Sequence, residues 1–168
     1  TDWCYRTAPD DGLNGRSLLY PRGKVLGGCS SINGMLYIRG QAQDYDDWRD
    51  GGNDGWGWED VLPALRKLED DQDHGGDLHG NAGPIPIVRW RDDELTPLQS
   101  SFQQACLAAG HPACDDHNVP GSTGVGSWAM NRTGTLRIST AIGYLNPARH
   151  RLNLTIRAGC EVNRVLVE

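Results

Sequence analysis

Residues 20–40 read YPRGKVLGGCSSINGMLYIRG and contain an unusual run of small residues. The five small residues GGCSS at 27–31 follow Val25 and Leu26, and the apolar run 35–38 comes shortly after them. A buried strand favours large and β-branched side chains, so this composition is typical of a backbone that a ligand approaches closely. A tight turn between two packed elements uses similar residues, and the residues alone leave both interpretations open.

The composition is that of an acidic chain of ordinary domain size. The chain has 168 residues, a formal net charge of −6 and an isoelectric point near 5.3. An acidic surface disfavours nucleic acid and anionic membranes, and no apolar run has the length of a membrane-spanning helix. We therefore expect no nucleic-acid partner and no membrane span.

The cysteines predict a reduced, cytoplasmic protein. Their number is odd and no two have C-x-x-C spacing, which fits free thiols better than a disulfide framework. They are Cys4, Cys29, Cys106, Cys114 and Cys160.

Both ends of the chain suggest a piece of a larger protein. The first residue is threonine, and the last eight residues, EVNRVLVE, alternate in polarity without a closing turn. A strand left in this way needs a partner. We expect the remainder of the same polypeptide to be that partner.

The first half of the chain is expected to contain loops and two helices. Turn signals predict a loop over 1–18, and the glycines of the opening segment allow only a short helix, over about 31–37. A second helix is predicted over 58–71, because its apolar residues share one face and acids occupy its first turn. Pro63 fits that helix only within the first turn.

Residues 70–84 are polar and rich in glycine and predict an exposed loop. The next segment, GPIPIVRW, places Ile85, Ile87 and Arg89 at alternate positions, and its prolines favour an edge strand. A clear helix follows, in which Thr96 is the N-cap, Pro97 the first residue and Gly110 the end. Its apolar stripe consists of Leu98, Phe102, Ala105, Cys106 and Ala109.

The last part of the chain predicts a strand near 127–131 and a short helix that Ser139 caps and Pro147 ends. Alternating apolar residues over 152–156 and 162–167, with a turn between them, predict a terminal β-hairpin. Helices and strands are mixed, so the expected fold class is α/β (α+β mixed).

The histidines are candidate metal ligands. The segment HPACDDH at 111–117 carries several ligand types, but one H-x-x-C without a second cluster matches no closed zinc pattern. His74 and His79 lie in the predicted acidic loop, and His150 lies between two arginines, so these three are expected to be solvated. The sequence assigns no metal site.

Two further chemistries are possible in GGCSS. Cys29 would be a nucleophile if a helix N-terminus or a base stabilised its thiolate. Converging backbone amides beside a helix start would also suit a phosphate. However, the lysine precedes the glycines, and no G-x-G-x-x-G follows a strand, so neither a Walker loop nor a Rossmann fingerprint is present.

PRGKVLGGCSSINGMLYIRG followed by DYDDW resembles the first signature of the glucose–methanol–choline (GMC) flavoprotein oxidoreductases. The segments DGWGWEDVLPALRKLED, LHGNAGPIPI, STAIGYLNPARHRLNLTI and CEVNRVLVE resemble successive blocks of the same family. Together they cover nearly the whole chain.

The resemblance implies that the glycine-and-serine segment lies against FAD. It implies backbone contact with the isoalloxazine and pyrophosphate, and places one residue of a later strand at the adenine end. In some choline-oxidising relatives a histidine is bonded covalently to the flavin, but the matching position here is Ile32, so we expect non-covalent FAD. The implied cofactor-binding residues are Gly27, Gly28, Cys29, Ser30, Asn33, Gly34, Met35, Leu36 and Val162.

The resemblance also implies the reaction and the domain plan. The reaction is oxidation of the CH–OH group of an alcohol by hydride transfer to FAD, with oxygen or another electron acceptor. The family's catalytic histidine matches no position in this chain, so no catalytic residue is assigned. Residues 1–83 would belong to the FAD-binding domain, 84–138 would begin the substrate-binding domain, and 139–168 would return to the FAD domain. An FAD-containing lyase and a non-catalytic fragment are the alternatives.

Overall fold

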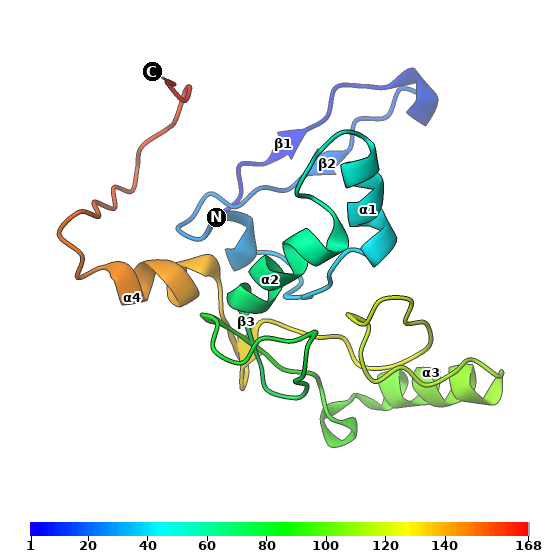
Figure 1. Ribbon diagram of the computed structural model, residues 1–168. Coiled ribbons are helices and arrows are strands. Elements are labelled where there is room, and N and C mark those ends of the chain that lie inside the picture. The colour runs from blue at the N-terminus through cyan, green and yellow to red at the C-terminus, as the bar shows by residue number, and fades with distance from the viewer. Residues whose placement is uncertain (168) are drawn as a thin grey trace. The chain divides into compact units, whose positions relative to one another are not determined.

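The computed structural model describes residues 1–167, and the chain forms two compact units. The terminal unit contains Thr1–Ile32 and the residues from Thr140 onward, and the central unit is Asn33–Ser139. Helices and strands occur together, which confirms the mixed fold class (Figure 1). No helix among the described residues has the length and apolar character needed to cross a membrane. The proposed domain assignment of 1–83, 84–138 and 139–168 stays a prediction.

The terminal unit begins with a hairpin, so the prediction of a loop over 1–18 is wrong. Strand β1, Tyr5–Arg6, pairs antiparallel with β2, Leu19–Tyr20, and the 3₁₀ turn η1, Asp11–Leu13, lies between them. Asp10 accepts a hydrogen bond from the Gly12 N–H at 2.7 Å and so caps that turn. The turn residues recognised in the sequence therefore close a hairpin.

The helix predicted over 31–37 is absent. A single 3₁₀ turn, η2, spans Gly28–Ser31, and the chain after it is extended. The Asn33 side chain accepts the Met35 N–H at 3.0 Å, a local bond that competes with helix formation. Tyr37 then donates its N–H to the Ala129 carbonyl at 2.8 Å, so strand-like pairing replaces the predicted helix.

A helical segment opens the second part of the terminal unit. The π-helix η4, Ala141–Leu145, runs directly into α4, Asn146–Ala148 (Figure 1). Thr140 is already helical, so the helical residues begin directly after Ser139, as predicted, whereas Pro147 lies inside α4 and does not end it. The prediction that Pro147 ends the helix is therefore wrong, since the helical residues continue to Ala148.

The terminal β-hairpin is also absent. Residues 152–167 form no strand, and the side chains of Leu152, Val162 and Val167 are largely exposed. An isolated two-stranded hairpin is marginal in water, so alternation alone does not stabilise one.

Two helices begin the central unit, and they lie side by side (Figure 1). Helix α1 spans Ala42–Asp50 and α2 spans Trp58–Leu68. The Asp60 carboxylate accepts the Gly57 N–H at 3.1 Å and caps α2, and Trp58 is buried against Tyr45. Pro63 is the sixth residue of α2 and lies beyond the first turn. The expectation that Pro63 fits the helix only within its first turn is therefore wrong.

Helix α2 ends three residues earlier than predicted, and those residues form a strand. Strand β3, Glu69–Asp71, pairs parallel with β4, Ile85–Ile87. Ile85, Ile87 and Arg89 are all buried, which confirms their predicted alternation. Next to β4, Val88 pairs with Met130, the only residue of the predicted strand 127–131 that forms bridges within the described chain.

The rest of the central unit contains η3, Asp92–Glu94, α3, Pro97–Ala108, and the hairpin of β5, Arg132–Thr133, with β6, Leu136–Arg137. Helix α3 begins as predicted, since the Thr96 hydroxyl accepts the Gln99 N–H and Pro97 follows the cap. Gly110, at φ +91°, ends it. Its apolar stripe is not buried within this chain, because Leu98 and Phe102 are 81% and 66% exposed.

Candidate cofactor site

The first half of the predicted cofactor segment lies in the terminal unit, around η2. Gly27 has φ +88°, and a Cβ there would lie 2.5 Å from the Ser31 Oγ and 3.2 Å from the Ala141 Cβ. The Gly27 carbonyl accepts the Ser30 hydroxyl at 2.6 Å, and the Ser30 Oγ accepts the Thr140 N–H at 3.0 Å. Intramolecular packing therefore requires glycine at position 27.

Gly28 is different. A Cβ built at Gly28 would meet no atom of the chain within 4 Å, and the next residue, Cys29, is exposed. Its φ of +55° is unfavourable for a side chain, yet the space beside it is open. The backbone at this position is thus accessible to a ligand.

The second half of the segment lies in the central unit. The Asn33 Oδ1 accepts the Met35 N–H and also a hydrogen bond from the Arg137 Nη1 at 2.7 Å, while Asn131 donates to the Met35 carbonyl at 3.1 Å. These bonds hold Met35 at φ +63°, a conformation that residues other than glycine rarely adopt. Such strain is typical of functional sites.

Gly34 and Leu36 flank Met35 and are both exposed. A Cβ at Gly34 would touch only the Leu36 Cγ, at 3.9 Å, and no positive φ requires glycine there. Leu36 is 53% exposed and lines an apolar groove of about 700 Å³ with Trp90, Phe102 and Trp128 among others. Neither packing nor backbone conformation explains the missing side chain at position 34.

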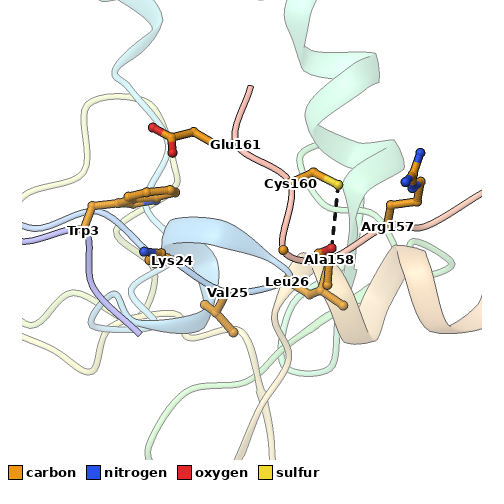
Figure 2. A pocket seen from close by; sticks show the side chains of 10 residues that line it. Trp3, Lys24, Val25, Leu26, Arg157, Ala158, Cys160 and Glu161 are labelled. Atoms are coloured by element: carbon orange, nitrogen blue, oxygen red, sulfur yellow. Dashed lines mark hydrogen bonds between the residues drawn. The ribbon is translucent and has the colours of Figure 1, made fainter. Parts of the chain in front are cut away.

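A second groove lies in the terminal unit, beside the residue predicted to meet the adenine. It has a volume of about 500 Å³ and is formed by residues 23–26 and 157–161 with Trp3 (Figure 2). The Lys24 Nζ lies 4.4 Å from the centre of the Trp3 ring, and Arg157 provides a second cation. Val162 follows the groove directly and is 78% exposed, in irregular chain and not in the predicted strand.

The described residues also contain a cluster of charges that the sequence did not predict. This ionic cluster consists of Arg39, Glu69, Asp71, His79, Arg89 and Asp116, and all six side chains are buried. The expectation that His79 is solvated is therefore wrong, and so is the prediction that the whole of 70–84 is an exposed loop.

His79 lies at the centre of the ionic cluster. Its Nε2 is 2.8 Å from the Asp116 Oδ2, and its Nδ1 is 3.1 Å from the Glu69 Oε1 and 3.2 Å from the Asp71 Oδ2. Hydrogen bonds to Asp116, Asp71 and Glu69 raise the pKa of His79 to about 11, so the imidazole is protonated at neutral pH. Burial alone would raise the pKa of Asp71 and of Asp116, but hydrogen bonds from His79 and Arg89 outweigh it and lower both.

The cluster also contains the one group of possible metal ligands found among residues 1–167. One ligand atom each from Glu69, Asp71 and His79 lie within 4.8 Å of one another. Arg89 binds Asp71 at 2.9 Å, Arg39 binds Glu69, and His79 is protonated, so three positive charges already balance three carboxylates. Ion pairing therefore explains the cluster without a metal. The acids of HPACDDH contribute only Asp116 to it.

Similarity to known proteins extends along nearly the whole chain. The family model described as GMC oxidoreductase matches residues 7–168. An oxygen-dependent choline dehydrogenase from Photobacterium profundum is 43% identical over 167 residues, which cover 99% of this chain and 29% of that protein.

Two solved structures give the same result at the level of the fold. Pyridoxine 4-oxidase from Mesorbium loti matches with a TM-score of 0.89 at 36% identity, over 99% of this chain and 33% of that one. An FAD-dependent oxidoreductase from Chaetomium thermophilum matches with a TM-score of 0.81 at 26% identity, over 90% of this chain and 28% of that one. The chain thus spans about 30% of its relatives' length. Because the family model and the aligned relatives cover almost every residue, this chain belongs to the GMC oxidoreductase family.

Proposed function

We propose that this chain is part of an FAD-dependent oxidoreductase that oxidises the CH–OH group of an alcohol. The observation that carries the proposal is the open space at Gly28 and Gly34, where a side chain would meet little or nothing of the chain itself. An external group lying against the backbone explains the missing side chain at Gly34 and would also use the open space beside Gly28. Family membership supports FAD as that group.

The residues present fit such a cofactor. Small residues leave the backbone accessible around η2 and at Gly34, and Lys24 and Arg157 offer positive charge to a diphosphate. Bound FAD would supply the hydride acceptor for the alcohol, while this chain orients the cofactor and keeps side chains away from its face. The proposed FAD-binding residues are Gly27, Gly28, Cys29, Ser30, Asn33, Gly34, Met35, Leu36 and Val162.

The proposed substrate is a small primary alcohol. Choline and pyridoxine, which the names of two relatives contain, both carry a primary alcohol. The electron acceptor is oxygen or another oxidant, and the group that accepts the hydroxyl proton lies elsewhere in the polypeptide. A cytoplasmic location stays a prediction from the cysteines.

The direct test is an absorbance spectrum of the full-length protein before and after acid precipitation. We expect flavin bands in the native protein and their complete transfer to the supernatant, because the Ile32 side chain has no atom that could bond to the flavin. Colour retained in the pellet would contradict non-covalent binding. A protein that carries no flavin and binds no added FAD would contradict the proposed function.

Gly34→Ala tests the location of the cofactor. The new methyl group enters space that the chain itself leaves open, so stability without FAD should be unchanged. Crowding against a bound ring should cost about 1–3 kcal/mol, which weakens FAD binding by about tenfold to a hundredfold. The measurement is FAD titration of the apoprotein, with thermal unfolding alongside.

Gly75→Ala is the matched control for that variant. Gly75 is exposed, has open space at its Cβ and lies outside the proposed cofactor segment. It should bind FAD as the wild type does. Equal FAD affinity in the Gly34 and Gly75 variants would remove Gly34 from the site.

A further inference from the structure

The extended segment 35–39 is connected to the ionic cluster at two points, through the side chain of Asn118 and through Arg39. Backbone pairing supports the beginning of this segment, where Asn131 donates to the Met35 carbonyl and Tyr37 donates to the Ala129 carbonyl. Leu36 and Met130 form an antiparallel bridge between these bonds. Backbone pairing therefore holds the segment as far as Tyr37.

Beyond Tyr37, the side-chain amide of Asn118 forms the next two bonds. Its Nδ2 donates to the Tyr37 carbonyl at 3.1 Å, and its Oδ1 accepts the Arg39 N–H at 2.9 Å. A carboxamide presents a donor and an acceptor side by side, so it can bind a C=O and an N–H two residues apart, as the N–H and C=O of one residue in a parallel strand do. Asn118 thus substitutes for a strand at this position.

The orientation of Asn118 is fixed by the ionic cluster. The residue is buried, and its backbone N–H donates to the Asp116 Oδ1 at 3.0 Å. The same carboxylate binds the Arg89 Nη2 and the His79 Nε2, each at 2.8 Å. A buried residue whose backbone is held in this way keeps its side-chain amide next to segment 35–39.

The other end of the segment is anchored in the same cluster. The Arg39 guanidinium binds the Glu69 carboxylate and donates to the Leu78 carbonyl at 2.8 Å. The Arg39 backbone, which Asn118 binds, therefore belongs to a residue whose side chain is itself immobilised. Asn118 and Arg39 are therefore both attached to the ionic cluster.

We infer that Asn118 is a positioning residue for the cofactor, because it fixes the end of segment 35–39 beyond the pairing with residues 129–131, and so limits how the segment and the preceding backbone at Gly34, Met35 and Leu36 can shift together. The inference rests on the proposed function, since it takes that backbone as part of the FAD site. Asn118 acts through the segment and touches no reacting atom. A displacement of a bound ring by about 1 Å can cost about a hundredfold in rate.

The test compares two variants of Asn118 in the full-length holoenzyme. Asn118→Asp keeps the acceptor for Arg39 but replaces the donor to Tyr37 by a carboxylate oxygen, and Asn118→Leu removes both bonds. Both should change the visible circular dichroism of the bound flavin and lower kcat at least tenfold, with little change in KM for the alcohol. Asn118→Leu should have the larger effect if both bonds contribute.

A core variant away from Asn118 and segment 35–39 distinguishes a loss of cofactor positioning from a general loss of stability. Trp58→Phe destabilises the central unit at the start of α2 without touching Asn118 or segment 35–39. It should lower the melting temperature but leave the flavin spectrum and kcat unchanged. Asn118 variants that behave like Trp58→Phe would overturn the inference while leaving the proposed function intact. A wild-type protein that binds no flavin would overturn both.

Discussion

Replacing His79 by phenylalanine is expected to destabilise the protein by about 3–5 kcal/mol. The substitution removes the positive charge that contacts Asp116, Glu69 and Asp71, and leaves three buried carboxylates with only two guanidinium groups. A buried charge that loses its partner keeps its desolvation cost, so the penalty exceeds that of losing a surface ion pair. Chemical denaturation of the full-length protein measures the change.

The pH dependence of the free energy of unfolding tests whether the charge of His79 causes this destabilisation. The pKa of His79 rises from an ordinary value of 6.5 to about 11 on folding, so its stabilising contribution is complete below pH 6.5. Above pH 6.5 that contribution should fall by up to about 1.4 kcal/mol per pH unit and vanish near pH 11. The pKa values of Asp71 and Asp116 are lowered, so their contributions are present above about pH 4 and are lost only in acid.

The difference in stability between wild type and His79→Phe should therefore shrink steadily from pH 6.5 to pH 9. His111→Phe is the control, because His111 is exposed in the same unit, and it should change the free energy of unfolding by less than about 0.5 kcal/mol. A constant difference across this pH range would show that His79 acts through its shape and not through its charge.

Gly80→Ala is the second substitution with a large expected effect, a loss of about 3 kcal/mol or more. A Cβ at Gly80 would lie 1.8 Å from the Arg66 carbonyl oxygen and 2.8 Å from the Glu69 carbonyl oxygen. Both neighbours are backbone atoms at the end of α2 and the start of β3, so no side chain can rotate to make room. Either the helix end or the strand has to move.

That movement would also disturb the ionic cluster. The Gly80 N–H donates to the Glu69 Oε1 at 3.0 Å, and the Gly80 carbonyl accepts the Asp71 N–H at 2.9 Å. Gly75→Ala, in the same connection between β3 and β4 but with open space at its Cβ, should be nearly neutral. Similar melting temperatures for the Gly75 and Gly80 variants would contradict the close packing of Gly80 against α2.

These two predictions bear on the site as well as on stability. The cluster that contains His79 also holds Asp116 and Arg39, the two residues through which Asn118 and segment 35–39 are anchored. We therefore expect His79→Phe to weaken FAD binding more than a core variant that is equally destabilised but lies away from the ionic cluster, such as Trp58→Phe. The ionic cluster is in this sense the support on which the second half of the proposed cofactor segment rests.

Some elements could be predicted from the sequence because their causes are local. The Thr96–Pro97 start of α3, the acids in the first turn of α2 and the alternation around Ile85 all depend on neighbours within a few residues. The predicted helix over 31–37 failed because pairing with residues 129–131, almost a hundred positions away, decides the conformation there. The prediction of a terminal hairpin failed because alternation of apolar and polar residues does not show whether a partner strand is present.

The sequence by itself determined the family, through motifs that lie along nearly its whole length, and with the family the expectation of a flavin. Only the tertiary structure decided which glycines serve packing and which leave a surface open, since Gly27 and Gly28 are adjacent yet only the first is crowded. It likewise decided that His79 is a buried cation and that Asn118 holds segment 35–39. The physical reason is that each case includes a contact between distant residues: His79 with Asp116, Arg39 with Asn118 and Gly27 with Thr140 lie 37, 79 and 113 positions apart. No local pattern encodes which distant group will fill or leave a space.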